Sequence, residues 1–121
     1  MTQEDKQLLL QDISARLPYG VKVQSYNYEE DVETIETLLE IDSYGYISTL
    51  ECDTLKNIYK PYLFPLSSMT GEQKTSHNFL KHSAHASPIK LVDWYNKNHF
   101  DYRGLIPMGL ANDATGLNIY E

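Results

Sequence analysis

The spacing of apolar residues near the start of the chain predicts a helix. They recur every three or four positions, which is the period of one helix face: Leu9, Leu10, Ile13 and Leu17. Thr2 and Asp5 have the spacing of a capping pair, and acidic residues in a first turn suit the helix dipole. Pro18 and Gly20 are typical of a helix end. We therefore expect a helix over residues 3–17.

The following apolar positions alternate with polar ones, which is typical of half-buried strands. Residues 21–26 show this alternation. Residues 33–42 fit either a helix or a strand; as a strand they would have Ile35 on one face and glutamates on a wet opposite face. Turn residues at 42–45 and an extended pattern over 46–52 favour the strand alternative, because short segments joined by tight turns suit an antiparallel meander.

The second half of the chain carries helix signals separated by proline. Residues 54–62 suit a short helix. A capping box at residues 70–73 opens another helix, and Ser87 followed by Pro88 marks the start of a third. Residues 101–121 have an irregular pattern, but their apolar residues indicate that this tail is docked on the body.

These elements predict one α+β domain over residues 1–121. It combines an N-terminal helix, a three-stranded antiparallel meander, two to three helices packed on one sheet face, and an irregular C-terminal tail. A chain of this length commonly forms a single hydrophobic core, and no tract resembles a linker.

Charge is distributed unevenly along the chain. Of 17 acidic and 10 basic residues, nine acidic ones lie between Glu29 and Asp53 with no basic residue among them. Direct nucleic-acid binding is not expected, because it needs clustered Lys and Arg, and an anionic membrane would repel the acidic segment. No apolar run is long enough to cross a bilayer, and the N-terminus lacks signal-peptide features, so we expect a cytoplasmic protein.

Two explanations fit the acidic segment. One is a solvated sheet face that keeps the protein soluble. The other is a surface for a partner protein with a basic face, where tyrosine rings beside carboxylates would contact Lys or Arg side chains. The residues of this surface are Glu29, Glu30, Asp31, Glu33, Tyr26, Tyr28, Tyr44 and Tyr46. A homo-oligomer, formed through an uncovered sheet edge or a tyrosine face, is a further alternative.

Reactive side chains are densest between residues 99 and 103. His99 and Asp101 are of the types that form an acid–base pair, and Arg103 would hold an anion. The structural alternative is that Asp101 pairs with Arg103 or caps a turn, while the neighbouring aromatic rings anchor the tail. A ligand site would need the three side chains to converge at a pocket.

Three histidines, His77, His82 and His85, lie close together in sequence. Their spacing lacks the ligand pattern of known zinc sites, so we expect exposed histidines at a polar helix end and no metal site. No catalytic residue and no cofactor are expected, because nucleophile and phosphate-binding motifs are absent.

Two longer stretches of the chain carry a family resemblance. Residues 60–70 are Lys-Pro-Tyr-Leu-Phe-Pro-Leu-Ser-Ser-Met-Thr, and residues 94–106 are Trp-Tyr-Asn-Lys-Asn-His-Phe-Asp-Tyr-Arg-Gly-Leu-Ile. With residues 17–22, they resemble a group of short acidic proteins of gut bacteria and their phages or prophages. The group has no assigned activity, so the resemblance implies a small product of a phage or mobile element and transfers no functional residue.

The sequence therefore favours a non-enzymatic protein-interaction module of phage or mobile-element origin. It would use its acidic, tyrosine-bearing surface to engage a basic partner. The alternative is a small hydrolase or ligand-binding protein with a site formed by His99, Asp101 and Arg103.

Overall fold

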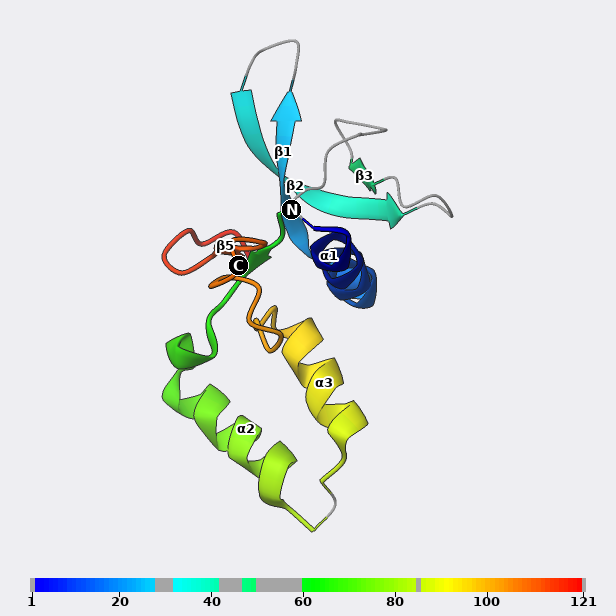
Figure 1. Cartoon of the computed structure of the whole chain (residues 1–121). Coiled ribbons are helices and arrows are strands. Elements are labelled where there is room, and N and C mark those ends of the chain that lie inside the picture. The colour runs from blue at the N-terminus through cyan, green and yellow to red at the C-terminus, as the bar shows by residue number, and fades with distance from the viewer. Residues whose placement is uncertain (1, 28–31, 42–46, 50–59, 85, 121) are drawn as a thin grey trace.

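The computed structural model describes residues 2–27, 32–41, 47–49, 60–84 and 86–120, and it confirms a mixed α+β architecture (Figure 1). The helices and strands, in chain order, are α1 (Gln3–Arg16), β1 (Lys22–Asn27), β2 (Val32–Ile41), β3 (Ile47–Thr49), β4 (Tyr62–Leu63), α2 (Gly71–His82), α3 (Pro88–Lys97) and β5 (Asn112–Asp113). Short 3-10 turns cover Leu17–Tyr19 and Leu66–Ser68. No described helix combines the length and apolarity needed to span a bilayer.

Local capping signals explain where the helices begin. The Thr2 hydroxyl accepts the Asp5 N–H and the Asp5 carboxylate accepts the Thr2 N–H, which forms the predicted box at the start of α1. Thr70 and Gln73 form the same reciprocal pair at the start of α2. Ser87 is the N-cap of α3, although its side chain makes no capping hydrogen bond. These boundaries depend on contacts within one helical turn, so the sequence predicts them well.

Strand β2 is central, pairing antiparallel with β1 and with β3. The strand alternative for residues 33–42 is thus confirmed over residues 33–41, and residue 42 lies outside the described residues. The expected orientation of its two faces is wrong, because Glu36 and Leu38 are buried whereas Ile35 is 42% exposed. Leu38 joins the core formed with α1, and its N–H donates to the Val21 carbonyl at 2.9 Å.

The connector after the undescribed residues 50–59 runs in an extended conformation beside the tail. Strand β4 pairs in parallel with β5, and Phe64 forms an isolated parallel β-bridge with Phe100. The short helix predicted over residues 54–62 lies mostly outside the described residues, and its end is wrong because Tyr62 belongs to β4. The tail is therefore docked on the body through backbone hydrogen bonds.

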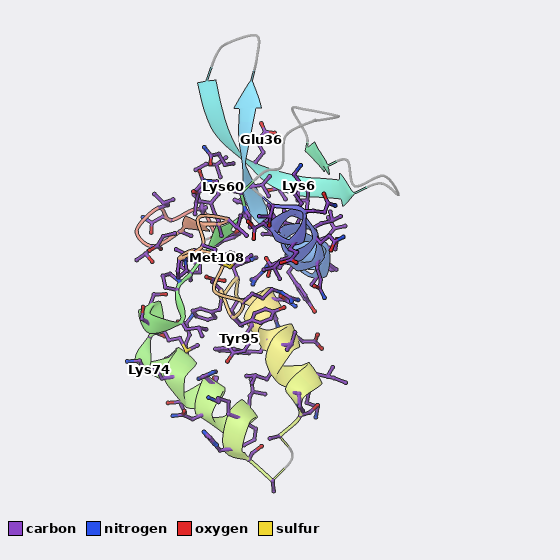
Figure 2. All side chains as sticks on the ribbon, in the orientation of Figure 1. Lys6, Glu36, Lys60, Lys74, Tyr95 and Met108 are labelled. Carbon is purple, nitrogen blue, oxygen red and sulfur yellow. The ribbon has the colours of Figure 1, made fainter. Side chains whose placement is uncertain are left out.

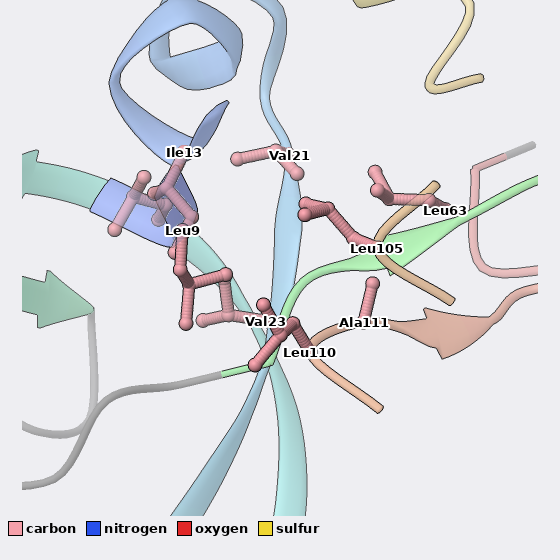
Figure 3. Close-up of a cluster of buried hydrophobic side chains, with 9 residues drawn as sticks. Leu9, Ile13, Val21, Val23, Leu63, Leu105, Leu110 and Ala111 are labelled. Carbon is pink, nitrogen blue, oxygen red and sulfur yellow. The ribbon is translucent and has the colours of Figure 1, made fainter. Parts of the chain in front are cut away.

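One aliphatic core holds α1, the sheet, the connector and the tail together (Figure 3). Leu9 and Ile13 of α1 meet Val23 of β1 and Val21, which directly precedes this strand, and all four are fully buried. The rest of this core comes from later segments of the chain: Leu38, Leu63, Leu105, Leu110 and Ala111. Burial of so many apolar side chains makes this body the main source of folding free energy.

Helices α2 and α3 form a hairpin that projects from the body on the side away from the sheet (Figure 1). The prediction that two to three helices pack on one sheet face is therefore wrong for these two. They have a second core instead, formed by Met69, Tyr95 and Phe100 with surrounding aromatic rings. This core joins the hairpin to the connector, because the aromatic rings of α3 pack in it together with residues that follow β4.

Candidate functional site

Arg103 takes part in an ion-pair network that joins the tail to α1. Its Nε donates to Asp12 Oδ1 at 3.1 Å, and Asp12 also accepts Arg16 Nε at 2.9 Å. Arg16 and Asp12 are completely buried, and Arg16 Nη2 donates to the Phe100 carbonyl at 2.6 Å. Both guanidinium groups lie over the Tyr102 ring, at 5.2 and 5.0 Å from its centroid. Arg103 is thus committed to internal contacts.

Sequence reasoning missed Asp12 and Arg16, although a signal was present. The two residues are four positions apart on one helix, which is the spacing of an intrahelical ion pair. Their complete burial could not be inferred locally, because the residues that cover them come from the far end of the chain.

Asp101 acts as a cap. One carboxylate oxygen accepts the Leu105 N–H at 2.9 Å, and the other accepts the Ile106 N–H at 2.9 Å. This confirms the turn-capping alternative for Asp101, whereas its proposed pairing with Arg103 is wrong because Arg103 pairs with Asp12.

His99 packs against Tyr120 near the C-terminus. The two rings are stacked with centroids 3.7 Å apart and planes 12° apart. Burial, aided by the positive charges of Arg16 and Lys22, lowers the pKa of His99 to about 4, so the imidazole is neutral near pH 7. Its Nδ1 has no hydrogen-bond partner among the described residues.

Tyr120 holds this stack in place. Its hydroxyl accepts the Lys22 N–H at 2.8 Å and donates to the Tyr62 carbonyl at 2.7 Å, so it bridges β1 and β4. Burial raises the pKa of Tyr120 to about 12. The hydroxyl therefore stays protonated through the physiological range and keeps its donor.

A pocket of about 310 Å³, termed here the His99 pocket, opens beside this stack. Its walls come from the connector, both hairpin helices and the tail: Phe64, Gln73, Lys97, Asn98, His99, Ala114, Gly116, Asn118 and Tyr120. Of the three residues predicted to form a ligand site, only His99 lines it. The expected convergence of His99, Asp101 and Arg103 on one pocket is therefore wrong.

His77 lies at the interface of the two hairpin helices. Its Nε2 is 2.6 Å from the Tyr95 hydroxyl, and its ring stacks on Trp94 with centroids 5.9 Å apart. Figure 2 shows Tyr95 on the side of α3 that faces α2. Burial, with the charges of Lys81 and His82, lowers the pKa of His77. The expectation that this histidine is exposed is wrong.

The remaining histidines bear on the metal expectation. His82 is exposed at the end of α2, and His85 lies outside the described residues. Within the described part of the chain, no three His, Cys, Asp or Glu side chains gather as a metal ion would require.

An apolar groove of about 450 Å³, termed here the α2–α3 groove, lies along the projecting hairpin. It is lined by Thr75, Ser76, Phe79, Leu80 and Trp94. Helix α2 contributes no buried residue, and Phe79 is 66% exposed. The side of α2 that carries Phe79 thus presents a large aromatic ring to solvent.

The acidic, tyrosine-bearing surface is mostly outside what the structure describes. Glu29, Glu30, Asp31, Tyr28, Tyr44 and Tyr46 lie outside the described residues. The backbone of the other two is described, and Tyr26 of β1 lies opposite Glu33 of β2 in the sheet register. Residues 28–31 connect these strands, since pairing ends at Asn27 and Val32.

Comparison of the chain with protein-family models, with curated proteins and with solved structures finds no match. No related protein thus indicates a site, and the candidate sites are identified from this chain's own residues. They are the His99 pocket, the α2–α3 groove and the β1–β2 connection.

Proposed function

We propose that this protein is a non-enzymatic protein-interaction module, of phage or mobile-element origin as the sequence resemblance implies, and that its α2–α3 groove binds the partner. The observation that carries the proposal is the solvent-facing apolar side of α2. Phe79 and Leu80 form an apolar groove with Trp94 that no other described segment covers. Grooves between helices on a protruding element are suited to an amphipathic partner segment.

The contacts of residues 99–103 support a binding role over hydrolysis. Asp101 has both oxygens occupied by backbone amides, and Arg103 is held by Asp12. His99 is neutral and stacked, and its pKa of about 4 is far below the range suited to a general base at pH 7. These groups stabilise the junction of body and hairpin.

The groove favours a partner that presents an apolar side chain next to an acidic one. Lys90 lies one turn before Trp94, so both residues are on the same face of α3. A carboxylate beside the inserted apolar group would reach this lysine at the edge of the groove, where the ion pair contributes orientation more than affinity.

Affinity purification from a gut-bacterial lysate, read by mass spectrometry, tests this proposal. We expect Phe79→Ala to lose proteins that the wild-type chain retains, because truncation of an interface aromatic ring commonly weakens binding by more than tenfold (about 2 kcal/mol). Ile89→Ala is the matched control, since Ile89 is 74% exposed on α3 but does not line the groove. Retention of the same proteins by all three chains would contradict the groove as the binding surface.

A second candidate surface is the acidic β1–β2 connection, with a basic protein as partner. The observation that favours it is the strand register, because Tyr26 lies opposite Glu33 and three acidic residues fall within the four-residue connection between the strands. The β1–β2 hairpin and the α2–α3 hairpin extend to opposite ends of the molecule (Figure 1), so the two surfaces can be tested separately.

Neutralising the acidic connection tests the second surface in the same assay. The variant changes Glu29→Gln, Glu30→Gln, Asp31→Asn and Glu33→Gln together, and we expect it to lose partners whose capture by the wild-type chain weakens at high salt. The control changes three exposed acidic residues elsewhere, Glu4→Gln, Glu72→Gln and Asp93→Asn. Equal losses from both variants would indicate a net-charge effect and reject a specific acidic surface.

A further inference from the structure

Two residues of the His99 pocket have an unusual backbone. His99 (φ 61°) and Asn118 (φ 54°) are the non-glycine residues with positive φ in the described part of the chain, and both line this pocket. Each costs about 1 kcal/mol or more relative to ordinary backbone. Left-handed backbone of this kind is found preferentially at functional sites, where the surrounding structure holds it in place.

The pocket also contains a buried polar side chain that the fold leaves unused. His99 is 9% exposed, and its Nδ1 makes no hydrogen bond to any described residue. Buried polar atoms are almost always paired in folded proteins, so such an atom beside a pocket needs a functional or structural explanation. Neither its stacking on Tyr120 nor the capping of the nearby turn by Asp101 supplies one.

The charge of the lining favours an anion. Among the described residues that line the pocket, Lys97 is the one with a formal charge and none is a carboxylate. The N-terminal turn of α2 and the C-terminal turn of α3 both contribute to the walls, through Gln73 and Asn98. The partial charges of these two helix ends are opposite and offset each other, which leaves the lysine to set the sign.

The other walls favour a planar body that can hydrogen-bond. The Phe64 and Tyr120 rings are 5.9 Å apart and tilted by 58°, which provides apolar surface for an aromatic ring. Gln73 accepts the Thr70 N–H with its amide oxygen, so its amide nitrogen remains a donor. Asn98 donates its amide nitrogen to the Trp94 carbonyl, so its oxygen remains an acceptor.

We propose that the His99 pocket binds a small planar organic carboxylate, with Lys97 holding the carboxylate group and the Phe64 and Tyr120 rings contacting the planar body. The volume of about 310 Å³ is at the small end of ligand pockets, which suits a single-ring compound. This site is separate from the α2–α3 groove, although α2 and α3 contribute to both.

Titration of the full ¹⁵N-labelled chain with benzoate, benzamide and benzylamine tests the proposal by NMR. We expect benzoate to cause saturable shifts in the backbone amides of residues 97–99 and 114–118, and to bind more tightly than the neutral amide or the cation. Inorganic phosphate is a fourth probe, and we expect it to bind more weakly than benzoate because it lacks a planar body. The absence of saturable shifts with benzoate, or tighter binding of any other probe, would overturn the proposal.

Two variants and a control locate the binding site. Lys97→Gln removes the charge and should raise the benzoate Kd by about tenfold or more, as loss of a charge-assisted hydrogen bond does. Asn118→Gly removes an amide while suiting the left-handed backbone, so it should keep the fold and weaken benzoate binding. Lys6→Gln removes an exposed lysine of α1 that does not line the pocket and should leave the Kd unchanged. Equal Kd values for the Lys97 and Lys6 variants would exclude Lys97 as the anion-binding group.

Discussion

The α1–sheet body and the α2–α3 hairpin are held together by different kinds of contact. The body has a core of aliphatic residues, of which Leu9, Ile13, Val21 and Val23 are fully buried. The hairpin has an aromatic cluster where it joins the body, and its helix α2 contributes no buried residue. Since buried apolar area is the dominant favourable term in folding, the body supplies most of the stability and the hairpin supplies exposed surface.

This difference has a consequence for function. Regions with few buried contacts open most easily and are where proteins most often place binding surfaces. The α2–α3 groove lies on the hairpin, and the His99 pocket lies at the junction of hairpin and body. The α2–α3 groove thus lies where the chain buries fewest residues, whereas the His99 pocket adjoins the aromatic core of the junction.

The largest expected effect is the difference in lost stability when one apolar residue is truncated in the body and one in the hairpin. Leu9→Ala should lower the free energy of unfolding by about 3 kcal/mol, because it opens a cavity in a fully buried core. Phe79→Ala should change it by no more than about 0.5 kcal/mol, because the ring is largely exposed. Urea denaturation followed by circular dichroism measures both. Similar losses for the two variants would break the comparison.

A smaller effect is expected at the junction, from the pH dependence of stability. The pKa of His99 is about 4 when folded and near 6.5 when unfolded, so between these values the unfolded chain binds a proton that the folded chain does not. Stability from this group is therefore fully present well above pH 6.5 and is lost progressively as the pH drops from 6.5 to 4.

Replacement of the imidazole isolates this contribution from that of the carboxylates. Asn tolerates left-handed backbone and does not titrate, so His99→Asn should flatten the stability profile between pH 6.5 and 4 relative to wild type. Denaturation midpoints measured across this range provide the test. A variant profile parallel to that of the wild-type chain would rule out His99 as the titrating group.

The smallest expected effect is confined to the hairpin. Tyr95→Phe removes the hydroxyl that bonds His77 and should weaken the contact of α2 with α3 by about 1 kcal/mol. Amide hydrogen exchange should become faster in α2 and stay the same in α1, because the two helices belong to different packing units. Equal acceleration in α1 would mean that the hairpin and the body unfold as one unit.

Much of the local structure could be predicted from the sequence. The capping pairs of Thr2 with Asp5 and of Thr70 with Gln73 are formed as expected, and residues 33–41 lie in a strand, as predicted. These features depend on hydrogen bonds within a turn or on the alternation of side chains along one strand. The face of that strand was nevertheless assigned wrongly, because the covering of Leu38 by α1 is not a local property.

The candidate site could be predicted only in part. The sequence points to His99, which does line a pocket, but the residues that join it there, such as Asn118 and Tyr120, come from the far end of the tail. Asp101 and Arg103 are predicted at the same site because they follow His99 by only two and four positions. Their actual partners are backbone amides and Asp12.

The sequence by itself determined the α+β class, the starts of α1, α2 and α3, and the separation of an acidic segment from a more basic second half, because composition and short-range spacing suffice for these. Only the tertiary structure decided that Arg103 would pair with Asp12, 91 residues away, and that α2 and α3 would form a hairpin projecting away from the sheet. Both outcomes depend on which buried charged groups and aromatic rings can contact each other in the folded chain. The free-energy cost of leaving a buried charge unpaired depends on how deeply it is buried, and no local sequence pattern encodes that burial.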